Sequence, residues 1–409
     1  MIDIPLDASP YEIYAGVYFH IPYCKKACHY CNFHFSTSLQ SKNDMVEALL
    51  KEIDITRGKN RRLVPTVYFG GGTPSVLLRK ELRALMDMIK RKFRLLPDAE
   101  FTYEVNPDDM NEMTVPFWKQ QGFNRLSIGI QSFRDQDLEW MNRSHSAQQA
   151  LDGLALVKEA GFTNYSIDLI YGIPGLSDEA WIKNIRTALS FEVPHISAYA
   201  LTVEPKTALN TMITQGKKEP VDAEQQARQF IILMDMLEAA GYEHYEISNF
   251  AKPGFRSRHN SAYWQGIPYF GFGPGSHSFD GYTRYWNVSN NAMYISSIIS
   301  NNIIPFDKED LTDTMHVNEY IMTSLRTMEG ISLSHITTRW GAHWAEGVKK
   351  ESMKHASRGM VRYDNDHIIL TREGKLYADG IAADMFFVET EGAEKDKEGT
   401  EKDTETRMG

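Results

Sequence analysis

The three cysteines of the chain all lie in one short segment, at Cys24, Cys28 and Cys31. Thiolates are the usual protein ligands of iron–sulfur clusters, and a short loop with this spacing can reach three corners of a compact cluster. A zinc site of the three cysteines with His29 or His34 is an alternative, although structural zinc sites usually draw on two separated ligand pairs. Three unrelated free cysteines are a weaker explanation, because the rest of the chain contains none. The segment predicts a four-iron cluster with one iron left without a protein ligand.

Glycines and polar residues recur at the ends of the strands predicted after this loop. In parallel α/β sheets and barrels, ligands bind at the carboxyl ends of the strands. One strand ends in glycines 70–72, where missing side chains let a ligand approach the backbone. Each of the other positions alone is typical of an ordinary surface residue, but their recurrence at one edge indicates a ligand site. They are Glu104, Gln131 and Asp168, with Arg143 in the segment that follows Gln131.

Short apolar runs alternate with helical patterns through the first half of the chain, which predicts strands joined by helical crossovers. The predicted strands are 16–21, 66–69, 101–105, 126–130, 165–170 and 196–201. Helical periodicity covers about 41–57 and 78–93, and Gly122 and Gly161 stand where helix C-caps are expected. This rhythm predicts a parallel sheet, either open and doubly wound or curled like a barrel.

The second half of the chain has a different texture. A helix is predicted over 222–240, followed by an irregular stretch rich in Gly, Pro and aromatic residues over 242–286. Segment 305–388 combines helical patterns at 315–327, 332–340 and 343–357 with a hairpin around Asp364–Asp366 and a last helix to about Phe387, which is typical of a small winged-helix-like domain. Its 13 acidic and 10 basic residues disfavour DNA binding. Residues 389–409, with 8 acidic and 4 basic side chains, are expected to be a disordered tail.

Composition limits the class of protein. A chain of 409 residues exceeds the size of one hydrophobic core, so two domains are expected. The net charge of −10 disfavours binding to nucleic acid. No apolar stretch is long enough to span a membrane, and the acidic start is unlike a signal peptide. Three cysteines do not make a disulfide framework, so we expect a reduced, cytoplasmic protein.

The cysteine loop and the strand-end residues closely resemble the radical S-adenosylmethionine (SAM) superfamily, over about residues 15–290. The resemblance implies an incomplete (β/α)6 barrel with a 4Fe-4S cluster on the three cysteines. It also implies that SAM chelates the fourth iron and is cleaved, on reduction, to a 5′-deoxyadenosyl radical. Tyr18 and Tyr30 would then flank the cluster. The implied SAM contacts are Gly71, Gly72, Thr73, Glu104, Gln131, Arg143, Asp168 and Ala200.

Three further segments, 19–22, 68–74 and 168–175, resemble oxygen-independent coproporphyrinogen III oxidases and the related HemW heme chaperones. The oxidases carry another cysteine where this chain has Phe33. The stretch Arg258–Trp264 matches the His-Asn-x-x-Tyr-Trp motif of the chaperones. An imidazole can ligate heme iron and aromatic rings can cover the macrocycle, which makes His259, Tyr263 and Trp264 candidate heme residues, with His277 as a second ligand candidate. The alternative is that His259 is a hydrogen-bonded histidine beside ordinary packing aromatics.

These observations favour a heme chaperone that carries a 4Fe-4S cluster and SAM and delivers heme to client proteins such as respiratory enzymes. A radical SAM enzyme that decarboxylates the propionates of coproporphyrinogen III is the second hypothesis, so catalysis stays open. An iron–sulfur electron carrier is a third, against which the strand-end residues argue. The expected domains are 1–290 for the cluster, SAM and heme and 305–388 for a C-terminal helical domain resembling that of the oxidases. The sequence is compatible with a homodimer.

Overall fold

The computed structural model describes residues 13–56 and 62–388 of the chain. They form two compact units. The first extends to Asp310 and also contains Arg326–Met328, and the second contains Leu311–Leu325 and the residues from Glu329 onward. The tail expected at 389–409 lies outside the described residues. Within the described ranges, no helix is long and apolar enough to cross a membrane.

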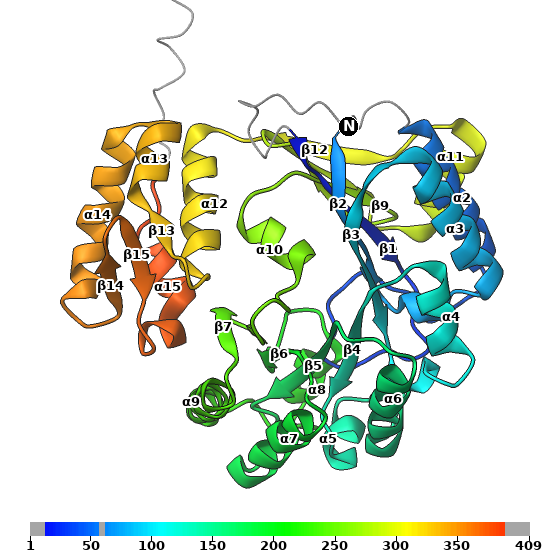
Figure 1. The fold of residues 1–409 in the computed structure, drawn as a ribbon, viewed down its shortest axis with the longest axis horizontal. Coiled ribbons are helices and arrows are strands. Elements are labelled where there is room, and N and C mark those ends of the chain that lie inside the picture. Colours follow the sequence, from blue (N-terminus) through cyan, green and yellow to red (C-terminus); the bar gives the residue numbers. More distant parts are fainter. Residues whose placement is uncertain (1–12, 57–61, 389–409) are drawn as a thin grey trace, which may run out of the picture. The chain divides into compact units, whose positions relative to one another are not determined.

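The first unit is built on one sheet whose central six strands follow chain order and run parallel (Figure 1). These strands are β1 (Gly16–Ile21), β2 (Leu63–Gly71), β3 (Arg94–Val105), β4 (Arg125–Gln131), β5 (Tyr165–Tyr171) and β6 (His195–Ala200). All six predicted strands are confirmed. The sheet curls without closing, as the resemblance to an incomplete barrel implied.

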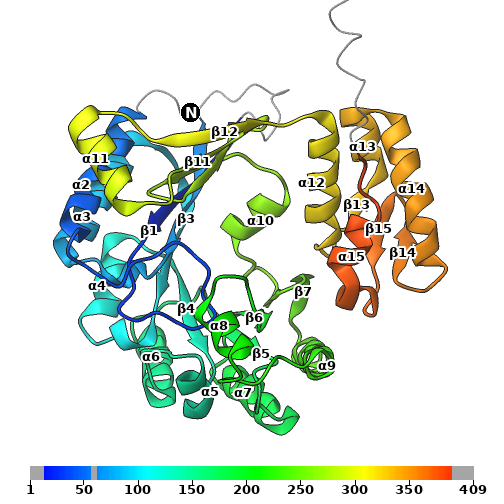
Figure 2. The same cartoon turned by 180° about the vertical axis from the view of Figure 1, so that it is seen from behind.

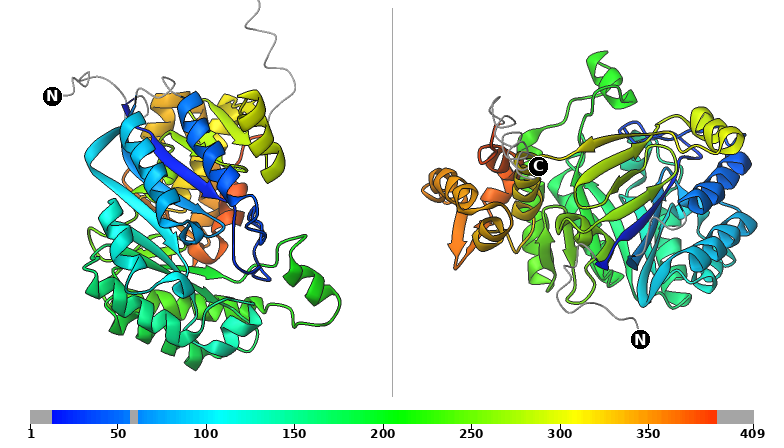
Figure 3. Two further views of the ribbon diagram at one scale, coloured as in Figure 1. Left: turned by 90° about the vertical axis from the view of Figure 1, so that its right-hand side faces the viewer. Right: turned by 90° about the horizontal axis from the view of Figure 1, so that it is seen from above.

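The crossover helices lie on the outer face of this curled sheet (Figure 3). They are α2 (Lys42–Ile55), α3 (Arg79–Lys92), α4 (Thr114–Gln121), α5 (Asp135–Trp140), α6 (Ala147–Glu159) and α7 (Asp178–Ser190). Both predicted cap positions are confirmed: Gly122 ends α4 with a φ of 107°, and Gly161 follows α6 with a φ of 74°. Side chains would strain this left-handed backbone, which glycine adopts freely.

The strands alternate between apolar residues that pack under the helices and polar residues that face the interior of the curl. On β1, Val17 and Phe19 are fully buried, and Phe19 stacks on Phe69 of β2. Because successive side chains of a strand point to opposite faces, Tyr68 of β2 turns inward, where it shares a cavity with Glu104 of β3. The interior is therefore lined largely by polar groups.

The prediction of an irregular stretch over 242–286 was wrong, because short strands there extend the sheet on both sides. β9 pairs in parallel with β1, and β8 pairs antiparallel with β6. The added strands are β7 (Glu243–Glu246), β8 (Asn249–Ala251), β9 (Tyr269–Phe272), β10 (His277–Phe279), β11 (Thr283–Asn287) and, beyond that stretch, β12 (Phe306–Asp310). Strands of three to five residues are too short to show the alternation by which strands are recognised.

The described part of the first unit contains four more α-helices: α8 (Ala208–Thr214), α9 (Ala223–Ala239), α10 (Arg258–Trp264) and α11 (Asn291–Asn301). The helix predicted over 222–240 is confirmed as α9, with Asp222 as its N-cap. Figure 2 shows α10 on the inner side of the curled sheet, away from the crossover helices. The motif segment Arg258–Trp264 is therefore a short helix within the barrel.

The second unit matches its predicted elements closely. Its helices are α12 (Asp313–Leu325), α13 (Leu333–Trp340), α14 (Ala342–Ala356) and α15 (Ala378–Ala383), and its small sheet contains β13 (Ile331–Ser332), β14 (Val361–Asp364) and β15 (His367–Leu370). The predicted hairpin is confirmed, with Asn365 at a positive φ of 52° in its turn. The last helix ends at Ala383, earlier than the predicted Phe387, and a 3-10 turn precedes it.

A buried carboxylate fastens the added strands to the helix that follows the cysteine loop. Glu52 of α2 accepts hydrogen bonds from the backbone N–H of Gly273 (2.9 Å), from Asn287 Nδ2 (2.7 Å) and from the Tyr294 hydroxyl (2.5 Å). Its side chain is 2% exposed, and burial raises the pKa of its carboxyl to about 7. Since these partners come from the β9–β10 loop, β11 and α11, one side chain holds three segments together.

We expect Glu52→Ala to lower the free energy of unfolding by about 2–4 kcal/mol, because it leaves buried donors without an acceptor. Chemical denaturation of the full chain, followed by tryptophan fluorescence, measures the change. Glu47→Ala, an exposed position on the same helix, is the matched control. Equal stability of the two variants would show that the cluster of hydrogen bonds is not needed.

Candidate functional site

The cysteine loop between β1 and α2 is held by loops from three other strands. In the segment that follows β3, Asp108 accepts a hydrogen bond from Lys25 Nζ at 3.0 Å. In the segment that follows β4, the Met141 carbonyl accepts a hydrogen bond from the backbone N–H of His29 at 3.1 Å. In the segment that follows β6, the backbone N–H of Leu209 in α8 donates to the His29 carbonyl at 2.7 Å. Cys24, Cys28 and Cys31 are thereby fixed, half-buried, at the carboxyl edge of the barrel.

Arg143 connects the cysteine loop to the ends of β3 and β4. One terminal nitrogen lies 3.4 Å from both Cys28 Sγ and the Tyr30 hydroxyl, and the other lies 2.8 Å from Asn106 Oδ1 and 2.9 Å from the Gly129 carbonyl. Its Nε is buried without a partner among the described residues. Arg143 therefore joins the cysteine loop to β4 and to the segment that follows β3.

The glycine run after β2 forms a cradle beside the first cysteine. The Thr73 hydroxyl donates to Cys24 Sγ at 3.3 Å. Gly71 has a φ of 110°, and a Cβ on Gly72 would lie 2.7 Å from the Tyr23 carbonyl oxygen. Side chains are excluded at both positions, because the glycine run packs directly against the segment that leads into the cysteine loop.

The cysteines fit a cluster better than a single metal ion. Burial raises the pKa of Cys24 to about 11 and also raises the pKa of Cys31, and the neighbouring thiols add to both shifts. A bound cation is the ordinary way to hold such thiols as thiolates. In residues 13–56 and 62–388, no three histidine, cysteine or acidic side chains converge on one ion. A cluster instead offers each thiolate its own iron.

Within the described residues, neither histidine of the zinc alternative converges with the cysteines on one ion, and each binds another loop through one ring nitrogen. His29 Nδ1 lies 3.2 Å from the Trp140 carbonyl, and His34 Nε2 lies 2.8 Å from Asn291 Oδ1. His34 also accepts, through its carbonyl, a 2.8 Å hydrogen bond from His20 Nε2. The geometry therefore favours a cluster carried by the three thiols with one corner free.

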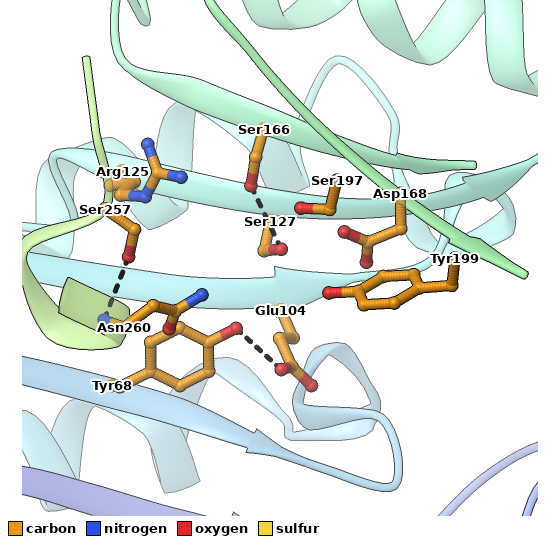
Figure 4. Close-up of a pocket in the computed structure, with 10 residues that line it drawn as sticks. All are labelled: Tyr68, Glu104, Arg125, Ser127, Ser166, Asp168, Ser197, Tyr199, Ser257 and Asn260. Carbon is orange, nitrogen blue, oxygen red and sulfur yellow. Dashed lines mark hydrogen bonds between the residues drawn. The ribbon is translucent and has the colours of Figure 1, made fainter. Parts of the chain in front are cut away.

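Glu104 and Asp168 face the interior of the barrel from β3 and β5 (Figure 4). The Tyr68 hydroxyl donates to Glu104 Oε1 at 2.7 Å. Burial, together with the charge of Asp168, raises the pKa of Glu104 to about 7 against the opposing hydrogen bond from Tyr68. Burial likewise raises the pKa of Asp168 to about 6, opposed by a hydrogen bond from Ser197 and by Arg143 and Arg125. Two such carboxyls are suited to accept hydrogen bonds from hydroxyl or amino groups of a ligand.

The other residues predicted to contact SAM lie around the same edge. The Tyr18 hydroxyl lies 3.1 Å from His20 Nδ1, and its ring stacks on Tyr68. Gln131 is buried with a positive φ of 65°, and Ala200 ends β6 opposite Tyr171.

Sequence reasoning missed three residues of this edge: His20, Asn106 and Asp108. Each lies within or directly after a strand that was correctly predicted. Reading every inward position of β1 would have found His20, whereas Asn106 and Asp108 required the residues that follow β3 to be read as well.

The candidate heme residues lie on two separate elements, α10 and β10. His259 of α10 is 2% exposed, with Nδ1 2.8 Å from Thr66 Oγ1 and Nε2 3.1 Å from the Tyr263 hydroxyl. Burial lowers its pKa to about 3, so the imidazole is neutral at physiological pH. Both ring nitrogens are thus occupied, and ligation of iron by His259 would require one of these hydrogen bonds to open. Trp264 packs on the Arg326 guanidinium, and its Nε1 has no partner within the described ranges.

The second candidate, His277, lies on β10. Its side chain is exposed and its ring stacks on Trp286 of β11. Its ring nitrogens make no hydrogen bond to the residues that the structure describes. Phe33, which stands where the oxidases have a cysteine, is 69% exposed directly after the cysteine loop.

An incomplete parallel barrel with a three-cysteine loop after its first strand defines a member of the radical SAM superfamily. Residues 18–188 match the family described as "Radical SAM superfamily", and residues 311–377 match the "HemN C-terminal domain". The solved structure of Escherichia coli coproporphyrinogen III oxidase (HemN) has the same fold, with a TM-score of 0.79 and 24% identity over 92% of this chain and 91% of that one.

The most informative relatives within this superfamily share the name heme chaperone HemW. The heme chaperone HemW of Bacillus subtilis is 36% identical, over 88% of this chain and 96% of the relative. HemW of Mycobacterium tuberculosis is 34% identical over 92% and 95%, and that of Escherichia coli 30% over 91% and 98%. The chain belongs to the HemW family of heme chaperones.

We expect Glu104→Gln to stabilise the ligand-free protein at high pH. The pKa of Glu104 is raised in the folded state, so ionisation opposes folding increasingly as pH rises from about 4.5 to 7. The amide removes this cost, and at pH 8 the free energy of unfolding should rise by about 1–3 kcal/mol. Toward pH 4 the difference should disappear.

Denaturation curves at pH 4, 6 and 8 test this expectation. Glu112→Gln, at an exposed position after β3, should change nothing at any pH. A Glu104→Gln effect that is the same at all three pH values would contradict the electrostatic cause.

Proposed function

We propose that the protein is a heme chaperone that holds a 4Fe-4S cluster and SAM and transfers heme to client proteins. The observation that carries this proposal is the similarity, over about nine-tenths of the chain, to relatives named heme chaperone HemW. The exposed Phe33 supports it, because the oxidases have a cysteine at that position.

In this proposal Cys24, Cys28 and Cys31 hold the cluster, which supplies one-electron chemistry toward SAM when bound. Thr73 and Arg143 donate to two of the sulfurs and so favour the thiolate form. The glycine run accepts the methionyl part of SAM against its backbone. Tyr18, Tyr30, Gln131 and Ala200 complete the pocket, and Glu104 and Asp168 accept hydrogen bonds from its polar groups.

Heme is assigned to the first unit, which contains both the motif segment and the cysteine loop. His259 is the proposed axial ligand, with His277 as the second candidate, and Tyr263 and Trp264 supply aromatic surface for the macrocycle. The domains proposed are 1–290 for cofactors and heme and 305–388 for the C-terminal part. The clients are heme-requiring proteins such as respiratory enzymes, reached from the cytoplasm, with no role for nucleic acid. A homodimer is compatible with this function.

We expect the anaerobically reconstituted protein to retain heme through gel filtration, seen as a Soret band, and His259→Ala to weaken the binding at least about tenfold, a loss of 1.4 kcal/mol. His277→Ala is measured beside it. His343→Ala, an exposed histidine of the second unit, is the control and should bind heme as the parent does.

Loss of heme binding in His277→Ala alone would identify His277 of β10, beside Trp286, as the axial ligand. A parent protein that retains no heme would contradict the chaperone proposal. Release of carboxyl mass from coproporphyrinogen III, with reductant and SAM present, would then favour the decarboxylase.

A further inference from the structure

The interior of the barrel contains a polar cavity of about 60 Å³ that extends beyond the acidic residues already described (Figure 4). Glu104, Asp168 and Tyr199 lie at one end, and Arg125, Ser257 and Asn260 lie at the other. Tyr199 is 43% exposed, so solvent reaches the acidic end. The far end lies against α10, the helix that carries the motif segment.

Arg125 is a buried cation that donates to no acidic acceptor among the described residues, although the charge of Asp168 acts on it across the cavity. Its side chain is 2% exposed, and its one hydrogen bond to the described residues runs from Nη1 to Asn164 Oδ1 at 2.5 Å. Nε is buried with no acceptor. Asp168 lies at the other end of the cavity and makes no hydrogen bond to Arg125, so an anion that offers acceptor oxygens would complete the guanidinium.

Apart from the carboxyls of Glu104 and Asp168 at the opposite end, the groups that line the cavity with Arg125 can donate hydrogen bonds. Hydroxyls come from four elements of the unit, at Ser127, Ser166, Ser197, Ser257 and Tyr199, and Asn260 adds an amide. One pair is already joined, Ser166 Oγ to Ser127 Oγ at 3.1 Å. Guanidinium and hydroxyl donors on several sides of a small cavity match a carboxylate, which accepts on two oxygens and pairs with arginine in a planar fork.

The volume also fits this group. A buried water needs about 10–15 Å³ in this measure, so the cavity takes about four atoms the size of water. A CH2–COO⁻ unit has four heavy atoms, whereas a porphyrin ring is far too large. The cavity therefore suits the carboxylate end of a ligand.

We propose that Arg125 and the surrounding hydroxyls bind a carboxylate inside the barrel, separate from the cysteine loop. Two sources share this chemistry: a free short-chain acid, and the propionate arm of a porphyrin whose ring lies outside the cavity. The proposed carboxylate site does not depend on iron ligation by any histidine, so it can be tested separately from the proposed heme ligand.

Two titrations of the full-length reconstituted protein distinguish the sources. Calorimetry with sodium propionate, against sodium chloride at equal ionic strength, tests the free acid. Absorption titration with metal-free protoporphyrin IX, against its dimethyl ester in the same detergent, tests the porphyrin arm. We expect Arg125→Gln to weaken binding at least tenfold in one arm, with no effect on the ester or on chloride.

Arg228→Gln, an exposed arginine of α9, is the matched control and should bind as the parent does. Should Arg125→Gln fail to fold, Ser197→Val keeps the arginine and fills the cavity, and it should remove the same binding. Equal affinity of parent and cavity variants in both arms, binding of chloride as tight as propionate, or displacement of propionate by SAM would each overturn the proposal.

Discussion

The carboxyl edge of the barrel depends on the burial of one guanidinium. Arg143 can leave water only because the cysteine loop, the loop after β3 and the end of β4 each give it an acceptor. A planar fork with fixed donor directions sets their spacing in a way that a lysine could not. Arg143 therefore sets the positions of Cys28, Tyr30 and Asn106 relative to one another.

The same strands give the barrel a polar interior, which an ordinary protein core avoids. Burial of Glu104, Asp168 and Arg125 costs free energy unless each finds a partner. Tyr68 and Ser197 satisfy the acids in part, while Arg125 keeps an unpaired nitrogen. The raised pKa values of the two acids record this cost. Such a core is stable only because the outer face, with residues such as Phe19 and Phe69, is packed against helices, so apolar burial on one face of the sheet supports polar burial on the other.

Much of the fold and of the cysteine site could be predicted from the sequence, because their signals are local. The apolar run at β1, the glycine caps Gly122 and Gly161 and the cysteine spacing each require only a few neighbouring residues. The added strands could not be found in this way, since β9 and β10 are short and their pairing partners lie far away in the chain. The hydrogen bonds of His259 are equally non-local: Thr66 and Glu100, which fix the ring and the start of α10, lie more than 150 residues earlier. A motif can thus be recognised in sequence while the environment of its histidine cannot.

Likeness of fold does not decide between chaperone and decarboxylase, because the oxidase of known structure shares the architecture at 24% identity. The difference between the two functions must therefore lie in side chains that the shared fold does not determine. Phe33 is one, since an exposed phenyl ring beside the cysteine loop can neither donate a proton nor form a thiolate. The α10 segment is another, because it brings an imidazole, a phenol and an amide into the barrel on one short helix. Glu100 holds the first turn of that helix through two backbone N–H groups, each at 3.1 Å. The helix is therefore part of the interior surface, and its side chains are the ones that a ligand entering the barrel would meet beyond the acidic pair.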